Sequence, residues 1–218
     1  MKKVMIFSLL PLFLCLFSAC EKAVSPTPET SPSPDDPSIS PSPTLESPSE
    51  DDIWRTPFTD SLDIDFEYEG RSFLEDGIGE VELSRCIDGD TARFTEDGGL
   101  SDYSVRFLGI DTPETGRNPE PWAYAASDHV CDALSNADSI VLEWDFSSLA
   151  RKGTYGRYLG FVWVDGRLLN LELVELAFTH ATGFSPKYGE IMHAAWHATM
   201  PSGRRIHGER DPDFDYGD

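Results

Sequence analysis

Charged side chains gather in three short segments of the chain. The segments are Asp88-Gly-Asp-Thr91, Arg106-Phe-Leu-Gly-Ile-Asp-Thr-Pro-Glu114 and Tyr155-Gly-Arg157. Between them they supply four carboxylates and two arginines. These groups can hold a hard divalent cation, activate a water molecule and bind a phosphate. The combination therefore indicates a metal-assisted phosphodiesterase acting on nucleic acid.

Two of the carboxylates are placed to share a cation. Asp90 stands at the start of one predicted strand and Asp111 at the exit of another, and the ends of adjacent antiparallel strands lie close together. Calcium accepts about six to eight oxygen ligands in loose geometry, so two carboxylates, a backbone carbonyl and waters suffice. Neither Asp has a Cys or His neighbour at a ligand-like spacing, which disfavours zinc.

The Thr112-Pro113 step fixes the direction of the chain after Asp111. A proline restricts the preceding residue to extended conformations, which sets where the Thr112 carbonyl and the Glu114 side chain point. We expect Glu114 to take a proton from a water beside the metal.

The two arginines are the candidate phosphate ligands. The planar fork of arginine suits bidentate contact with phosphate and offsets the extra charge of a five-coordinate transition state. Arg106 lies five residues before Asp111, and an odd separation on a flat strand would place them on opposite faces. We therefore predict an irregularity at Gly109, and a bend at Gly156 before Arg157.

Each segment alone has a simpler interpretation. Asp-Gly is usually only a turn, Asp-Thr-Pro-Glu is a common helix start, and an arginine in a strand is usually a surface group. Only the ordered combination makes the catalytic interpretation the better one.

The pattern of apolar residues predicts strands and helices around these segments. Strands are expected at 80–87, 90–96, 103–110, 139–145 and 158–164, with a hairpin at Asp88-Gly89. Helices are expected at about 122–136, 168–177 and 188–200. The predicted fold class is α+β, mainly β: a five-stranded OB-fold barrel capped by about three helices.

The N-terminal residues indicate export. Residues 1–20 read as a signal peptide, and their Ser-Ala-Cys ending resembles a bacterial lipoprotein signal in which Cys20 is lipidated. Residues 21–56 are rich in Pro, Ser and acidic residues, a composition typical of a disordered stalk that could reach roughly 100 Å. We expect a lipid-anchored protein on the extracellular face of a bacterial membrane, with simple secretion as the alternative.

The rest of the chain is expected to hold one domain. The predicted nuclease domain covers 79–208, and an acidic, solvated tail covers 209–218. Residues 57–78 are apolar enough either to pack on the domain or to add an edge strand. Cys86 and Cys131 could pair, but each also fits a half-buried core position.

The charge of the chain argues against non-specific nucleic-acid binding. The whole chain carries a formal charge of −22, and residues 79–208 hold 19 acidic against 11 basic residues. Non-specific binding depends on lysines and arginines that displace counterions from the phosphates. Nucleic-acid chemistry must therefore come from a local site with a bound cation.

The three segments resemble those of the thermonuclease (staphylococcal-nuclease-like) family in order and spacing, over about residues 80–208. The resemblance implies an OB-fold and calcium-dependent cleavage of DNA and RNA that leaves 3′-phosphates. It also implies roles for single residues. Asp90, Asp111 and the Thr112 carbonyl would bind Ca²⁺, Asp88 would lie in the outer shell, Glu114 would be the base, Arg106 and Arg157 would bind the phosphate, and Tyr155 would touch the nucleotide.

The sequence departs from the family pattern around this set. Thr154, Ala181, Gly183 and His207 stand where a lysine, two tyrosines and a tryptophan are expected, and the loop after Glu114 has only Arg117 as a base. These departures predict weaker or differently selective substrate binding. The expected protein is a monomeric nuclease. The alternative is a non-catalytic OB-fold module that binds nucleic acid at the cell surface, although such a module has no need of Glu114.

Overall fold

The computed structural model describes residues 56–96, 98, 101–147, 150–183 and 187–217. The predicted signal peptide, Cys20 and all but the last residue of the predicted stalk lie outside the described residues. Across the part that is described, no helix is long and apolar enough to cross a membrane.

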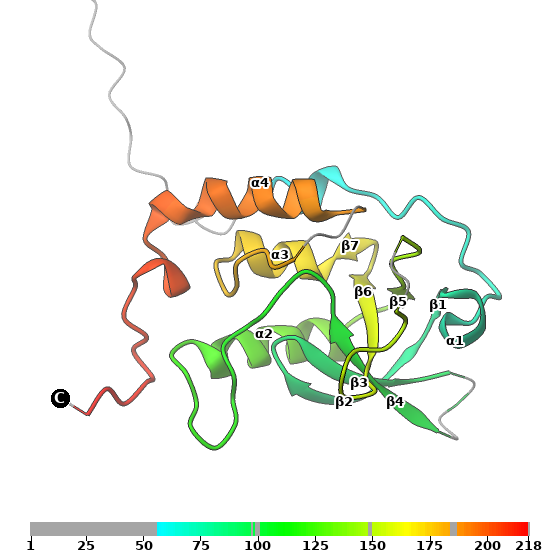
Figure 1. Cartoon of the computed structure of the whole chain (residues 1–218), viewed down its shortest axis with the longest axis horizontal. Coiled ribbons are helices and arrows are strands. Elements are labelled where there is room, and N and C mark those ends of the chain that lie inside the picture. Colours follow the sequence, from blue (N-terminus) through cyan, green and yellow to red (C-terminus); the bar gives the residue numbers. More distant parts are fainter. Residues whose placement is uncertain (1–55, 97, 99–100, 148–149, 184–186, 218) are drawn as a thin grey trace, which may run out of the picture. The chain divides into compact units, whose positions relative to one another are not determined.

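Seven strands form the framework of the folded part (Figure 1). They are β1 (Ile78–Glu80), β2 (Glu82–Asp88), β3 (Thr91–Thr95), β4 (Asp102–Phe107), β5 (Ile140–Glu143), β6 (Tyr158–Val164) and β7 (Arg167–Leu168). The five predicted strands correspond to β2 through β6. The two additional strands are only three and two residues long, too short to show an alternating pattern.

The strands are hydrogen-bonded in the order β1-β5-β6-β4-β3-β2, and β7 pairs with β6. Every pair is antiparallel except β4 with β6. Parallel neighbours need a long crossover, and the chain from β4 to β6 supplies it through a helix and β5. The predicted mainly β, α+β fold is confirmed, but hydrogen bonding does not close the sheet between β1 and β2.

Three longer helices accompany the sheet, as predicted. They are α2 (Ala123–Ser135), α3 (Leu169–Glu175) and α4 (Gly189–Thr199), while α1 (Phe73–Asp76) is a single turn. Short 3-10 turns occur at Thr59–Ser61, Met200–Ser202 and Arg205–His207. In Figure 1, α4 lies alongside α3, and α2 lies beside β2.

The core lies between the sheet and these helices. Its largest fully buried side chains include Phe94, Phe107, Phe161 and Trp163 from the strands and Leu171 from α3. Buried residues alternate at the end of β4, whereas the consecutive residues 160–163 of β6 are all buried, so β6 is covered on both faces.

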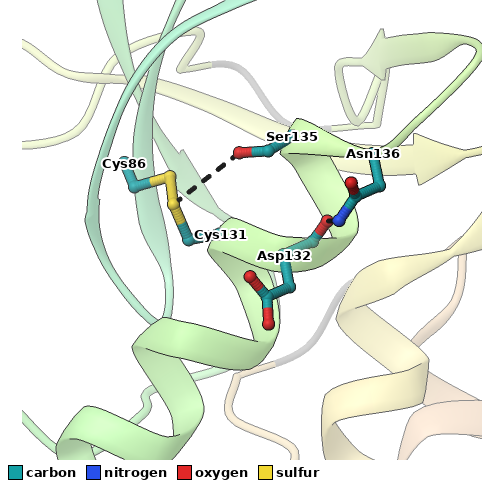
Figure 2. Close-up of a disulfide and its surroundings, with 5 residues drawn as sticks. All are labelled: Cys86, Cys131, Asp132, Ser135 and Asn136. Carbon is teal, nitrogen blue, oxygen red and sulfur yellow. Dashed lines mark hydrogen bonds between the residues drawn. A yellow bond between two sulfur atoms is a disulfide. The ribbon is translucent and has the colours of Figure 1, made fainter.

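A disulfide joins β2 to α2. Cys86 and Cys131 are bonded, with their Cα atoms 5.6 Å apart (Figure 2). The sequence left this pairing open. The bond fastens the strand that leads into the Asp88 hairpin to a helix that follows the Glu114 segment.

Residues 57–78 both pack on the domain and extend its sheet. The buried Glu175 carboxylate of α3 accepts hydrogen bonds from the Phe58 and Thr59 amides, each at 2.8 Å. Further along, the short segment that begins at Ile78 pairs with β5 as β1.

The C-terminal residues 209–217 are mostly exposed, as the sequence predicted, and Asp211 is the exception. Asp211 is only 8% exposed, and its carboxylate accepts a hydrogen bond from the Trp122 amide at 2.5 Å. The expectation of a solvated residue fails at Asp211 because its partner group lies 89 residues away in the sequence, where no local pattern can reveal it.

Candidate active site

Asp90 occupies the turn between β2 and β3, where the Asp88-Gly89 hairpin places it. Its side chain is 1% exposed. Its Oδ2 accepts from the Thr112 amide at 3.0 Å, and its own amide donates to Asp88 Oδ1 at 3.2 Å. The hairpin therefore buries the Asp90 side chain and places the Asp88 carboxylate next to the Asp90 amide.

Arg106 joins the two predicted metal-binding carboxylates. One guanidinium nitrogen donates to Asp90 Oδ1 and the other to Asp111 Oδ1. The two acids differ in exposure, since the Asp111 side chain is 60% exposed. The two carboxylates thus converge on one positive charge at the edge of the site.

The predicted irregularity at Gly109 brings Arg106 and Asp111 together. Strand β4 ends at Phe107, and Gly109 has a positive φ of 75° that side chains other than glycine rarely adopt. Beyond it, Thr179 holds Asp111 from the other side: its hydroxyl accepts from the Asp111 amide at 3.0 Å and donates to the Asp111 carbonyl at 2.8 Å.

Arg157 reaches the same site through Thr91. The Thr91 hydroxyl donates to Asp90 Oδ1 at 3.0 Å and accepts from Arg157 Nη1 at 3.1 Å. Arg157 follows Gly156, whose φ of 75° provides the predicted bend. Tyr155 is 85% exposed, and its ring centroid lies 5.9 Å from the Arg157 guanidinium carbon, so its ring is open to solvent beside the site.

Glu114 lies in a cleft that begins at Asp111. The cleft has a volume of about 490 Å³ and is lined by Asp111, Thr112, Pro113 and Glu114 together with Glu120, Phe178, His180 and Ile206. Glu114 is exposed, and its amide donates to the Glu120 carboxylate at 3.0 Å. The candidate base and two candidate metal-binding residues, Asp111 and Thr112, therefore line one solvent-accessible space.

The electrostatics around Asp90 favour a bound cation. Burial raises the pKa of Asp90 to about 7, the Arg106 charge opposes this rise, and the Asp88 charge adds to it. A single guanidinium therefore does not fully compensate the buried negative charge. Nearby, the Thr112 hydroxyl oxygen is buried without a hydrogen-bond partner.

The candidate metal donors at this site are all oxygen atoms. Within the described residues, no three or more His, Cys, Asp or Glu side chains form a group that could hold a metal. A cation here would rely on two carboxylates, the Thr112 backbone and water. Such an all-oxygen set suits Ca²⁺, which tolerates irregular geometry and water ligands.

Three residues of the site escaped the sequence analysis as functional groups. Thr91 belongs to the Asp-Gly-Asp-Thr segment, so its place at the start of a strand beside Asp90 was a usable signal. Glu120 and Thr179 had no such signal, because their contacts to Glu114 and Asp111 depend on how loops fold.

Comparisons with known proteins agree with this arrangement. A family model described as "Staphylococcal nuclease homologue" matches residues 104–198. A thermonuclease of Staphylococcus hyicus is 32% identical over 135 residues, which are 58% of this chain and 76% of that protein. A thermonuclease of Staphylococcus intermedius is 36% identical over 118 residues, or 52% of this chain and 67% of that protein.

The chain belongs to the staphylococcal nuclease family. The SPbeta prophage-derived endonuclease YokF of Bacillus subtilis is 36% identical over 99 residues, covering 44% of this chain and 32% of that protein. The resemblance predicted from the three segments is thereby confirmed. The staphylococcal nuclease match begins within β4 and ends within α4, so it contains Arg106, Asp111, Glu114 and Arg157.

Proposed function

We propose that this chain is a calcium-dependent endonuclease that hydrolyses phosphodiester bonds of DNA, RNA or both and leaves 3′-phosphate ends. One observation carries the proposal. Arg106 binds both Asp90 and Asp111, and Arg157 is linked to the Asp90 carboxylate through the Thr91 hydroxyl. Family membership supports it, since relatives named thermonuclease and endonuclease are 32% to 36% identical over the matched residues.

Asp90, Asp111 and the Thr112 carbonyl would hold the cation, with Asp88 behind Asp90. A bound Ca²⁺ would supply positive charge to the phosphate oxygens and a position for the attacking water. The Thr112 amide and the Thr91 hydroxyl already orient the two Asp90 oxygens, at 3.0 Å each. These two hydrogen bonds hold the buried Asp90 carboxylate in a fixed position, which lowers the entropic cost of ordering it when a cation and substrate bind.

Glu114 is the proposed general base. It would remove a proton from the water whose oxygen attacks phosphorus, while the bond to the 5′ oxygen breaks and that oxygen takes up a proton from solvent. The phosphate then remains on the 3′ side. Proton removal by a positioned carboxylate contributes about 10²- to 10⁴-fold to a rate of this kind.

Arg106 and Arg157 are proposed to bind the scissile phosphate. Arg106 has about five N–H donors, so its bonds to the two carboxylates leave donors for a phosphate oxygen. Arg157 uses Nη1 on Thr91, and its remaining donors can contact a second oxygen. Two permanently charged groups would offset the negative charge that builds up in the five-coordinate transition state.

The proposed place of action is outside the cell. The apolar segment up to Cys20 and the Pro- and Ser-rich residues after it support a lipid-anchored protein on a stalk, acting as a monomer on environmental DNA or RNA. Labelling cells with a radioactive fatty acid, for the wild type and Cys20→Ser, tests the anchor. Label on both proteins, or on neither, would contradict it.

The activity is tested with the purified chain, a single-stranded DNA and a single-stranded RNA, in millimolar calcium or in excess chelator. We expect cleavage only with calcium, and product fragments that a 3′-phosphatase can process. Fragments bearing 5′-phosphates would contradict the proposed bond cleavage. Calcium-dependent binding without cleavage would instead favour the non-catalytic OB-fold module.

A further inference from the structure

The C-terminal segment contacts the chain just after the loop that carries Glu114. The Trp122 amide donates to Asp211 Oδ2 at 2.5 Å, and the Trp122 indole Nε1 donates to the Glu209 carbonyl at 3.2 Å. We call these two hydrogen bonds the tail contact. Asp211 is buried in it, although the segment around it is polar and otherwise mostly exposed.

Trp122 holds an unusual backbone conformation at this point. Its φ of 68° is in the left-handed region, which bulky residues seldom occupy. Trp122 is also the residue immediately before α2, and its side chain makes no capping hydrogen bond. The Asp211 carboxylate beside the start of α2 is favourable electrostatically and satisfies the Trp122 amide. The tail contact thus supports a backbone geometry that Trp122 would not adopt readily alone.

Asp211 is itself held in place within the segment. Its amide donates to the Tyr216 hydroxyl at 3.0 Å, and its second carboxylate oxygen accepts from the Asp213 amide at 3.0 Å. Hydrogen bonds within the C-terminal segment therefore orient the Asp211 carboxylate independently of its contact with Trp122.

A second set of hydrogen bonds links Ala123, the residue after Trp122, back to Glu114 through Glu120. The Glu114 amide donates to Glu120 Oε2 at 3.0 Å, and the Glu120 amide donates to the Glu114 carbonyl at 3.1 Å. The Glu120 carbonyl in turn accepts from the Ala123 amide at 3.1 Å, in the turn that contains Trp122. The backbone from Trp122 to Ala123 and the hydrogen bonds of Ala123 and Glu120 therefore connect Asp211 to the backbone of Glu114.

We propose that Asp211 is a positioning residue for Glu114: through the tail contact it fixes the end of the loop formed by residues 112–122. The inference rests on the proposed role of Glu114 as the base. The beginning of this loop is fixed separately, by the Thr112 amide on Asp90. Without Asp211 the loop keeps its first attachment and loses the support at Trp122, so Glu114 samples positions too far from the reacting water.

The kinetic test compares Asp211→Ala with Asp215→Ala in the full chain. Both changes remove one negative charge from the segment, but the Asp215 carboxylate accepts a hydrogen bond from the nearby Gly217 amide, whereas the Asp211 carboxylate accepts from Trp122. We expect Asp211→Ala to lower kcat at least about tenfold with KM changed less than about twofold, because a displaced catalytic group slows chemistry more than binding. Asp215→Ala should match the wild type. Equal kcat for all three proteins would overturn the proposal.

A double variant separates positioning from general weakening of the fold. If Asp211 acts through Glu114, then Asp211→Ala should cause no further loss of kcat in a Glu114→Gln background. A full additional tenfold loss would show that Asp211 acts by another route. Tyr216→Phe provides a milder variant, which removes one hydrogen bond to Asp211 without changing charge and should lower kcat in the same direction.

Amide hydrogen exchange gives a readout that does not depend on activity. The amides of Glu114, Glu120 and Trp122 should exchange at least about tenfold faster in Asp211→Ala, while those of β3 keep their wild-type rates. Unchanged exchange in the loop would overturn the inference even if the enzyme is active. A wild-type chain that cleaves no nucleic acid would refute the proposed function, and the exchange data would still decide whether Asp211 fixes the loop.

Discussion

At the scale of single residues, Arg106 is the centre of the site. It binds Asp90 and Asp111 at once, and its side chain is only 18% exposed. Lysine is a point charge on a flexible chain and cannot make such paired, planar contacts. The residue types and their spacing placed Arg106 in the site as a phosphate ligand, but they did not predict its simultaneous bonds to Asp90 and Asp111.

Arg106→Lys should therefore abolish most of the activity while the protein stays folded. We expect kcat to fall about 10²- to 10³-fold, the usual loss when one donor to a transition-state oxygen is removed. Steady-state cleavage of a DNA oligonucleotide measures it. Arg93→Lys is the matched control, since Arg93 is also on the sheet but pairs with Asp102 at the surface. Similar kcat values for both variants would refute the central role of Arg106.

At the scale of elements, turns place the catalytic groups. The β2–β3 hairpin carries Asp90, the segment after β4 carries Asp111, and the bend at Gly156 presents Arg157. Strong turn residues and alternating strands made these elements predictable from sequence. The short strands β1 and β7 were not, because two or three residues show no periodicity.

Contacts between distant elements were the other part that sequence could not provide. The disulfide, the attachment of Thr179 to Asp111 and the tail contact join residues between 45 and 89 positions apart. Each depends on the final packing of the sheet and helices, and no local sequence pattern predicts such a contact. The buried Asp211 is the clearest example, since its surroundings in sequence are those of a solvated tail.

Gly89 tests the importance of the hairpin. A Cβ at this position would lie 2.7 Å from the Thr112 hydroxyl and 3.0 Å from Ala126 Cβ, so Gly89→Ala must displace the Thr112 side chain or α2. We expect a loss of about 1–3 kcal/mol in the free energy of unfolding by denaturant, and a loss of activity of at least about tenfold from the shifted ligand. In the control Gly189→Ala, at the start of α4, nothing lies within 4 Å of the new Cβ. A Gly89→Ala protein equal to the wild type in both measurements would contradict this account.

At the scale of the whole molecule, charge limits how the protein meets its substrate. The chain carries −22 overall, so the polyanionic substrate is repelled except where Arg106 and Arg157 lie. Non-specific binding of nucleic acid needs many cations, whereas this chain offers two at the candidate site. Binding should therefore depend on local contacts, and much less on the general attraction that basic nucleases use.

The salt dependence of binding measures this difference. Two phosphate contacts predict a slope of about −1.4 for the logarithm of the binding constant against the logarithm of salt on single strands. Screening of the general repulsion should make the slope shallower still. Fluorescence anisotropy with the Glu114→Gln protein in calcium gives the value. A slope steeper than about −3 would require about four or more contacts and would contradict the assignment of only two.

The central claim is that Glu114 performs base catalysis on a phosphodiester bond in a calcium-dependent site. Single-turnover cleavage of a single-stranded DNA, with wild type, Glu114→Gln and the exposed control Glu190→Gln, tests it most directly. We predict that Glu114→Gln lowers the rate about 10²- to 10⁴-fold with calcium binding unchanged, and that Glu190→Gln cleaves normally. A Glu114→Gln protein that cleaves at the wild-type rate in calcium would contradict the claim.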